Sequence, residues 1–204
     1  MIVYIPFKPQ NPKTRLSPVL SQEERSEFSL AMLKDVYDAV AETGHRPIVL
    51  STRELSSDLR TRVSPKELTP AVNSVLDEVP VSIVMADLGI ATSQSLERLF
   101  NSEADLAIVP GRGGGTNAFV TRSQSFEVDY HGTSYLDHLR IARENDLEID
   151  EVDSFRLSTD MDEPDDLVEV LMHSRGRARD YLEDRFELVV EEEDEKTRVG
   201  LRRL

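Results

Sequence analysis

Two aspartates in the last quarter of the chain have a spacing that suits a divalent cation. Asp160 and Asp162 have one residue between them, so in an extended segment both carboxylates point to the same side. Two like charges held together require a cation or a proton, and Mg²⁺ takes one or two carboxylates together with substrate phosphates. The alternative is that these acids cap a helix predicted from Glu163 to Met172, which explains the acids inside that helix better than it explains this pair.

A third carboxylate, Asp87, follows the most apolar run of the chain, Val81–Met85. That run predicts a central strand buried on both faces. Ligands of parallel sheets bind beyond the carboxyl ends of the strands, which is where Asp87 lies. A metal ligand and a simple cap of the following turn both remain open for this residue.

A cationic segment follows the first predicted strand, Val3–Ile5. It carries Lys8, Lys13 and Arg15, and its three prolines stiffen it without making it helical. Lysine offers a point charge and arginine a bidentate fork, so the segment suits a polyphosphate. The alternative is a solvated basic loop. We favour the phosphate site because the rest of the chain is acidic and poor in lysine.

A glycine run, Gly113-Gly114-Gly115, comes directly after the predicted strand Ala104–Val109 and is followed by Thr116 and Asn117. Glycine allows backbone angles closed to other residues and lets a ligand lie against main-chain N–H groups. Such groups form concavities that hold anions, phosphates above all. A plain surface turn is the alternative, because a lone glycine-rich run is a weak signal.

Other reaction classes find little support in the sequence. No cysteine is present to act as a nucleophile or thiolate ligand, and the four histidines show no close zinc-binding spacing. The G-x-S-x-G elbow and the G-x-x-x-x-G-K-[ST] phosphate loop are both absent.

The elements that must position these residues alternate between strand and helix. Strands are predicted at Val3–Ile5, Pro47–Leu50, Val81–Met85, Ala104–Val109 and Asn117–Arg122, and helices at 21–44, 69–78, 92–100, 132–145 and 163–172. This order predicts an α/β fold with a mainly parallel sheet. We assign residues 1–185 to this domain.

The tail, residues 186–204, has a different pattern. Two strand-like runs, Phe186–Val190 and Arg198–Leu201, are separated by the charged run 191–196. This predicts a β-hairpin-like extension. A lone hairpin is marginally stable, so we expect it to pack on something, plausibly a second subunit.

The charge balance limits the partners and the setting. The net charge is −15, from 39 acidic and 24 basic side chains, which argues against a nucleic-acid partner. Only 5 of the basic residues are Lys and 19 are Arg, a combination that predicts adaptation to high salt. The chain lacks cysteine, a signal peptide and any apolar run near 18 residues, so we expect no membrane contact and a cytoplasmic protein.

Taken together, the motifs resemble the 2-phospho-L-lactate guanylyltransferase family of coenzyme F420 biosynthesis, in its archaeal form. The resemblance spans nearly the whole chain, and the Gly-Gly-Gly-Thr-Asn element is its most specific part. The matching motifs are Phe7-Lys8 with Lys13-Thr14-Arg15-Leu16-Ser17, Met85-Ala86-Asp87-Leu88, Pro110 to Ala118, Gly132-Thr133-Ser134-Tyr135 and Asp160 to Leu167.

The resemblance implies a Rossmann-like nucleotidyltransferase fold, a homodimer, and transfer of GMP from GTP to 2-phospho-L-lactate with release of pyrophosphate. It also implies roles for single residues. Mg²⁺ would be held by Asp87, Asp160 and Asp162. The GTP phosphates would meet Lys8, Lys13 and Arg15, which with Asp87 form the catalytic set, beside Gly113, Gly114 and Gly115. The acceptor would be bound by Thr116, Asn117, Gly132 and Ser134.

Two departures from the family pattern bear on these roles. Gly89 replaces a common proline after Asp87-Leu88, which predicts a looser metal loop, and Thr69 replaces a common asparagine, which puts base or ribose contacts in doubt. Other acceptors, phosphoenolpyruvate or 3-phosphoglycerate, remain alternatives. A sugar nucleotidyltransferase or glycosyltransferase of similar fold and a non-catalytic nucleotide-binding protein are the more distant ones.

Overall fold

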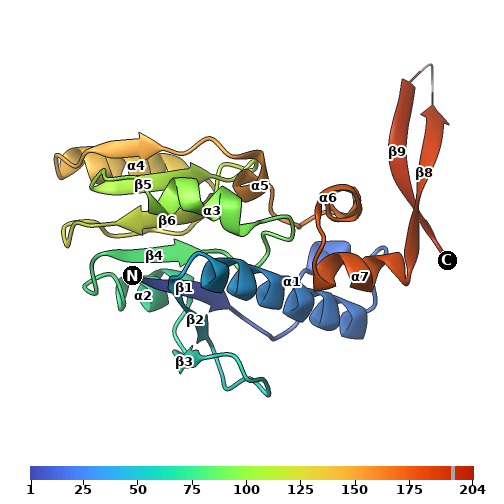
Figure 1. The fold of residues 1–204 in the computed structure, drawn as a ribbon, viewed down its shortest axis with the longest axis horizontal. Coiled ribbons are helices and arrows are strands. Elements are labelled where there is room, and N and C mark those ends of the chain that lie inside the picture. Colours follow the sequence, from blue (N-terminus) through green and yellow to red (C-terminus); the bar gives the residue numbers. More distant parts are fainter. Residues whose placement is uncertain (194–195) are drawn as a thin grey trace.

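A seven-stranded sheet forms the centre of the computed structural model, which describes residues 1–193 and 196–204 (Figure 1). Its strand order is β3-β2-β1-β4-β6-β5-β7. The strands are β1 (Ile2–Phe7), β2 (Arg46–Ser51), β3 (Thr61–Val63), β4 (Val81–Val84), β5 (Leu106–Pro110), β6 (Thr116–Thr121) and β7 (Ile149–Glu151). The strand predicted at Val81–Met85 is β4. It is the middle strand of the sheet, and all four of its residues are buried.

The sheet is parallel except at β6, which runs antiparallel to both β4 and β5. The mainly parallel α/β fold predicted from the sequence is therefore confirmed. The exception has a local cause, because the short glycine-rich segment after β5 leaves no room for the long crossover that a parallel neighbour needs. β5 and β6 form a hairpin that presents the glycines at its tip.

Helices cover both faces of the sheet (Figure 1). The helices are α1 (Gln22–Glu42), α2 (Leu68–Asn73), α3 (Ser93–Phe100), α4 (Ser134–Glu144), α5 (Phe155–Ser158), α6 (Asp166–His173) and α7 (Arg177–Glu183), with a short 3-10 helix at Thr14–Leu16. One buried cluster joins the sheet to α1, α3 and α5, and a second joins it to α2 and α4. Ser21 caps α1 in a capping box with Glu24.

A third buried cluster lies beyond the sheet, where the first half of α1 meets α6 and α7. Phe28 and Met32 of α1 pack there with Leu167, Leu182 and the first hairpin residue, Phe186. This cluster fixes the segment between α5 and α6, which carries Asp160 and Asp162, against the end of the sheet.

The tail forms the predicted hairpin, β8 (Phe186–Glu193) paired antiparallel with β9 (Lys196–Arg203). It projects from the body of the protein next to α7 (Figure 1). Both strands extend further than predicted and take in residues 191–193 and 196 of the charged run expected between them, while residues 194–195 lie outside the described residues. The base is fixed to α1, because Arg203 donates to the Val19 carbonyl at 2.7 Å and pairs with Glu24 at 2.5 Å.

Several elements differ from the prediction. The second helix is shorter, ending at Asn73 instead of Glu78, and the residues after it continue as turns that still bury Val75 and Leu76. The short strands β3 and β7 and the short helices α5 and α7 were not predicted, because three to seven residues are too few to establish a period. In the described residues, no helix is long and apolar enough to cross a membrane.

Candidate active site

A cleft of about 600 Å³ opens at the carboxyl ends of β1 and β4. It is lined by the cationic segment after β1, by Asp87 after β4 and by Asp162 before α6. Two smaller cavities adjoin it. One, of about 310 Å³, shares Arg15 and Asp162 with the cleft and adds Asp160 and Gly113. The other, of about 250 Å³, lies on the side of β2 and α2 and is largely apolar.

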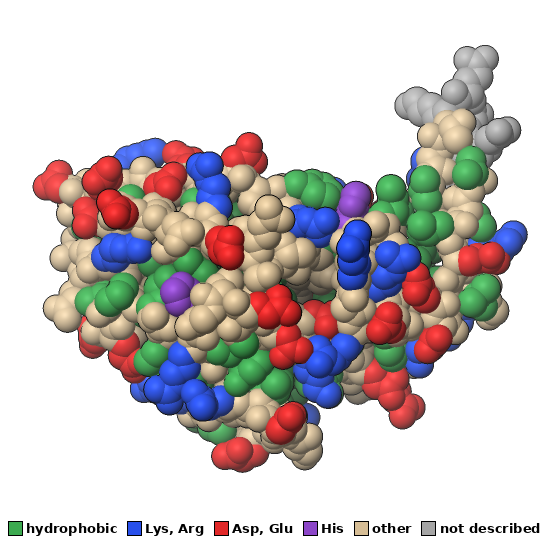
Figure 2. Space-filling view, in the orientation of Figure 1, with side chains coloured by type: hydrophobic (Ala, Val, Ile, Leu, Met, Phe, Trp, Pro, Cys, Tyr) green, Lys and Arg blue, Asp and Glu red, His purple; other side chains and the backbone are tan. Residues whose placement is uncertain are grey.

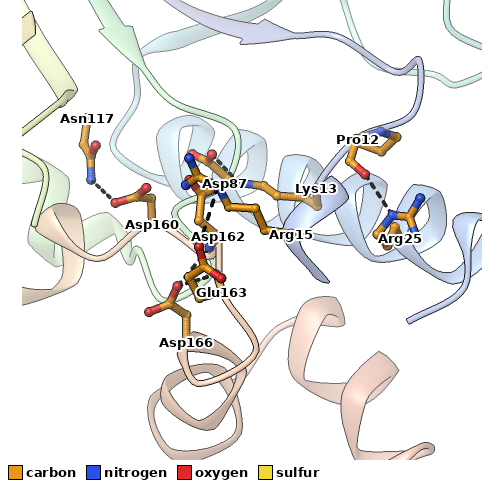
Figure 3. Close-up of polar contacts among 10 residues, drawn as sticks. All are labelled: Pro12, Lys13, Arg15, Arg25, Asp87, Asn117, Asp160, Asp162, Glu163 and Asp166. Carbon is orange, nitrogen blue, oxygen red and sulfur yellow. Dashed lines mark hydrogen bonds and ion pairs between the residues drawn. The ribbon is translucent and has the colours of Figure 1, made fainter. Parts of the chain in front are cut away.

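Lys13 joins two of the three predicted metal ligands. Its ammonium donates to Asp87 Oδ2 at 2.6 Å and to Asp162 Oδ1 at 2.7 Å (Figure 3). Arg15 adds a contact to Asp162 Oδ2 at 3.2 Å. Burial alone would lower the pKa of Lys13, but the charges of the two carboxylates outweigh it and raise that pKa above its usual value. The ammonium is therefore a fixed positive charge at the strand ends.

The cationic segment is held in place by a residue that the sequence did not indicate. Arg25 of α1 is buried and donates to the Pro12 carbonyl at 3.2 Å (Figure 3). It also donates to the Leu20 carbonyl and to Asn11 Oδ1, both at 3.1 Å. Lys13 itself has φ 49° and ψ 49°, a left-handed conformation that is uncommon outside glycine. The clamp by Arg25 and the two carboxylates keeps the backbone in that conformation.

Asp160 lies on the other side of the carboxylate cluster. Asn117 of β6 donates to its Oδ1 at 3.3 Å and also to the Leu157 carbonyl at 3.0 Å. Burial, and then the charge of Asp87, raise the pKa of Asp160 above its ordinary value. The backbone N–H of Met161 donates to the Asp87 carbonyl at 3.1 Å, which ties the two acidic segments together.

The chemistry of this cluster fits a divalent cation. Asp87 Oδ1 is buried and has no hydrogen-bond partner among the described residues, and buried polar atoms are normally paired. Asp160 also lacks a cationic partner in the described part of the chain, and it lies close enough to Asp87 for the charge of that carboxylate to raise its pKa. Within the same residues, no group of three or more His, Asp or Glu side chains is gathered closely enough to hold an ion unaided. A nucleotide's phosphates would complete such a site.

One other acid of the segment, Asp166, has the capping role left open above. Asp166 Oδ2 accepts from the backbone N–H groups of Asp162 and Glu163 at 3.0 and 2.8 Å. The helix therefore begins at Asp166 rather than at Glu163. Asp162 takes no part in that cap through its side chain, which points to Lys13 instead (Figure 3).

The glycine run forms the tight turn between β5 and β6. Gly114 has φ 84°, and its N–H donates within the turn to the Gly111 carbonyl at 2.9 Å, so that N–H is not free for a ligand. A side chain at Gly111 would lie 2.5 Å from Asn117 Oδ1, so glycine there makes room for Asn117. Gly113 lines the cavity that contains Asp160.

A bulge in β6 lies directly after the glycine turn. Val109 pairs with Ala118 but Pro110 pairs with Thr116, so Asn117 is the extra residue. Asn117 reaches Asp160, whereas the Thr116 hydroxyl lies 2.8 Å from His138 Nδ1 on α4.

The other predicted acceptor residues lie at the start of α4. Ser134 is buried and Gly132 is exposed. The Tyr135 N–H donates to the Gly114 carbonyl at 3.1 Å, so the glycine turn and the first turn of α4 are in direct contact. Lys8 lines the cleft and the apolar cavity, but it does not contact the carboxylate cluster; it is exposed and pairs with Glu67 at 3.6 Å.

The two departures from the family pattern have structural roles. Gly89 is enclosed, since a Cβ there would lie 3.1–3.2 Å from Met161, Met32 and Val170, so a residue without a side chain fits the packing at this position. The Thr69 hydroxyl accepts from the Tyr130 N–H at 2.9 Å, on the face of α2 that meets the segment before α4.

Comparison with known proteins agrees with this geometry. Residues 1–203 match the family described as guanylyl transferase CofC like. The chain is 50% identical to a 2-phospho-L-lactate guanylyltransferase of Halomicrobium mukohataei, over 89% of this chain and 91% of the relative. It is 46% identical to the enzyme of that name from Methanoculleus marisnigri, over 98% and 94%.

Solved structures show the same fold at low identity. A nucleotide-diphospho-sugar transferase described as putative, from Desulfovibrio desulfuricans, matches with a TM-score of 0.76 at 14% identity, over 90% of this chain and 94% of that one. A nucleotidyl transferase from Methanothermobacter thermautotrophicus matches with a TM-score of 0.57 at 14% identity, over 90% and 99%. At these identities the likeness concerns the fold alone.

Proposed function

Because this chain belongs to the CofC-like guanylyl transferase family, we propose that it transfers GMP from GTP to 2-phospho-L-lactate in coenzyme F420 biosynthesis. The products are lactyl-2-diphospho-5′-guanosine and pyrophosphate. The observation that carries the proposal is the pairing of Lys13 with Asp87 and Asp162 at the strand ends, with Asp160 adjoining. Cations and carboxylates together suit the handling of a metal-bound polyphosphate.

The nucleotide would span the cleft and the apolar cavity next to it. Lys8, Lys13 and Arg15 line the cleft and would meet the phosphates. The cavity of about 250 Å³ is lined by Lys66 and Glu67 as well as by apolar groups. Guanine offers an acceptor at O6 and a donor at its amine, so a lysine and a glutamate there are complementary to it.

Asp87, Asp160 and Asp162 would hold the Mg²⁺ that accompanies GTP. When bound, the ion would neutralise charge on the phosphates during transfer. The Lys13 ammonium would then contact both carboxylates and phosphate oxygens, since it lies in the same cleft. Lys13 would thus keep one positive charge at the strand ends beside the metal.

The acceptor would approach through the cavity of about 310 Å³ between the glycine turn and the acidic segment before α6. Gly113 to Gly115, Thr116, Asn117, Gly132 and Ser134 would surround it. Support comes from Gly113, which lines that cavity, and from the contact of the glycine turn with the first turn of α4. Arg15 and Arg112 also line this cavity and would neutralise the acceptor's charge.

The reaction requires little beyond positioning and charge. An oxygen of the acceptor's phosphate attacks the α-phosphorus of GTP, a new P–O bond forms, and the bond to the β-phosphate bridging oxygen breaks. The attacking phosphate is already anionic, so no general base is needed. The barrier lies in bringing two polyanions together, which the fixed cations of the cleft lower.

A substrate panel tests the proposal. The purified protein is incubated with Mg²⁺ and GTP, ATP, CTP or UTP, each with 2-phospho-L-lactate, phosphoenolpyruvate or 3-phosphoglycerate, and the products are identified by mass. We expect the guanosine product of 2-phospho-L-lactate to dominate. A preference for another acceptor would revise the substrate alone, whereas nucleotide binding without any product would support the non-catalytic alternative.

We also propose that the enzyme is a cytoplasmic homodimer and that the hairpin contributes to the dimer contact. Leu188, Val190 and Val199 are 40–70% exposed on the hairpin, and hydrophobic side chains gather along it in Figure 2. An exposed apolar face on a projecting two-stranded sheet is marginal alone and favours burial against another chain.

A further inference from the structure

His138 lies in a buried network behind the glycine turn, between α4 and the start of β6. The side chain has 0% exposure and is packed edge-on between the rings of Phe126 and Tyr130, at centroid distances of 6.0 and 5.1 Å. Both ring nitrogens have partners. Nδ1 lies 2.8 Å from Thr116 Oγ1, and Nε2 lies 3.0 Å from the backbone nitrogen of Asp129.

These two contacts fix the proton on the ring. A backbone N–H can only donate, so His138 Nε2 must offer its lone pair to Asp129. Burial lowers the pKa of His138 to about 4, despite the nearby charges of Asp129 and Asp137, so the ring is neutral at neutral pH. The single ring proton is therefore on Nδ1.

The position of this proton determines how the Thr116 hydroxyl can hydrogen-bond. Nδ1–H donates to Thr116 Oγ1, so the hydroxyl accepts from His138 and cannot donate back to it. Its own proton must point elsewhere. No other group in the described part of the chain is seen to accept it, although Thr116 is only 3% exposed. A buried hydroxyl whose proton has no partner is a prepared donor.

We propose that His138 is a positioning residue that holds the Thr116 hydroxyl as a hydrogen-bond donor for an anionic oxygen of the acceptor. The proposal rests on the function proposed above, which places the acceptor beside Thr116. It goes further in assigning a direction to that hydroxyl and a residue that sets it. His138 follows Ser134 by four residues on α4, so both side chains share one helix face near Thr116.

Variants of His138 separate positioning from mere packing. His138→Asn keeps an N–H near the place of Nδ1, His138→Gln offers an oxygen near the place of Nε2 without that donor, and His138→Phe keeps the ring and neither contact. We expect KM for 2-phospho-L-lactate to stay within about threefold of wild type in the Asn variant. It should rise about tenfold in the other two, the effect of one lost hydrogen bond, while KM for GTP is unchanged.

A double-mutant cycle with Thr116→Val tests the connection between the two residues. Because the valine has no hydroxyl to direct, adding His138→Phe should raise the acceptor KM no further. Fully additive effects, or equal losses in all three His138 variants, would overturn the proposal and leave His138 a packing residue.

The ring proton is measurable without any turnover. ¹⁵N shifts of the His138 imidazole at pH 7 should show protonated Nδ1 and unprotonated Nε2. The opposite tautomer, or a doubly protonated ring, would overturn the proposal even in an active enzyme. If the tautomer is as expected but wild-type protein makes no product from this acceptor, the proposed function has failed and the hydroxyl's preset direction stands.

Discussion

The proposed site has two halves that prepare for substrate in different ways. In the charged half, Lys13, Asp87 and Asp162 pair with one another at 2.6 and 2.7 Å, and their side chains are 10–40% exposed. In the neutral half, Thr116 and His138 form a hydrogen bond at 2.8 Å with exposures of 3% and 0%. The first half is ionic and reaches solvent, and the second is neutral and sealed.

The difference follows from the task proposed for each half. Charges that compensate one another can exchange partners when a metal–nucleotide complex arrives, with little net change in buried charge. A neutral buried hydrogen bond cannot exchange with water and so keeps one geometry. We infer that the charged half supplies rate and that the neutral half supplies recognition of the acceptor. Substitutions should therefore affect kcat on one side and KM on the other.

The largest effect is expected from the carboxylates. Asp160→Asn and Asp87→Asn should each lower kcat by about a thousandfold with the fold intact, because the ligand charge for Mg²⁺ is lost. Asp165→Asn, which removes the same charge from an exposed position of the same segment, is the matched control. Steady-state pyrophosphate release measures all three. Wild-type activity in either variant would remove the metal assignment.

Lys13→Met should have the next largest effect, lowering kcat about a hundredfold. It should also strengthen binding of Mn²⁺, used in place of Mg²⁺, to the nucleotide-free protein, because Asp87 and Asp162 lose the ammonium that now neutralises them. Electron paramagnetic resonance of free Mn²⁺ measures that binding, with Lys34→Met on α1 as the control. Weaker Mn²⁺ binding in Lys13→Met would contradict this view of the charged half.

The neutral half should reveal itself in the pH dependence of stability. The pKa of His138 is lowered from 6.5 to about 4 by burial, so between these values the unfolded chain binds the proton and the folded one does not. The free energy of unfolding should therefore decrease as the pH is lowered through this window, by roughly 2 kcal/mol between pH 7.5 and pH 5. Urea unfolding of wild type and His138→Asn measures the difference. Identical pH slopes would show that His138 does not titrate as inferred.

Substitutions in the hairpin should weaken the proposed dimer and leave both halves of the proposed site unchanged. Val190→Glu combined with Val199→Glu, a cross-strand pair on β8 and β9, should shift the dimer toward monomer by tenfold or more in dissociation constant. Leu136→Glu, at another exposed apolar residue, is the control. Sedimentation at several concentrations measures the mass. An unchanged dimer would place the subunit contact elsewhere.

The smallest effect concerns salt. With 39 acidic against 24 basic side chains, surface repulsion should weaken as salt rises. We expect the free energy of unfolding to increase by about 1–2 kcal/mol from 0.1 M to 2 M KCl. Thermal unfolding across that series measures it, and a flat curve would argue against adaptation to high salt.

The charged half could be predicted from the sequence because Lys13 and Asp87 follow recognisable strands and Asp162 has a spacing from Asp160 that suits a cation. Lys13, Asp87 and Asp162 were each assigned to one site, and the structure brings them into direct contact. Their long-range pairing was not predictable in detail. That Lys13 itself would bridge two of the metal ligands depends on a left-handed backbone at that residue, which no pattern indicates.

Most contacts of the neutral half could not be predicted from the sequence. His138 lies 22 residues after Thr116, and only the antiparallel return of β6 and its bulge bring the two together. Arg25 was hidden in the same way, because a charged residue at the start of an amphipathic helix is normally solvated. Contacts of this kind depend on tertiary packing, whereas charge and glycine spacing can be read locally.

The most direct test of the whole account is the requirement for pyrophosphate release. Protein, [γ-³²P]GTP and Mg²⁺ are mixed with and without 2-phospho-L-lactate, and labelled pyrophosphate is separated from labelled phosphate. Release of pyrophosphate should need the protein, the metal and the acceptor together, and should stop in Asp160→Asn. Equal release without the acceptor, or full release without Mg²⁺, would contradict the account. The charged half of the site would then not depend on the metal to transfer GMP, or the neutral half would not be needed to bind the acceptor.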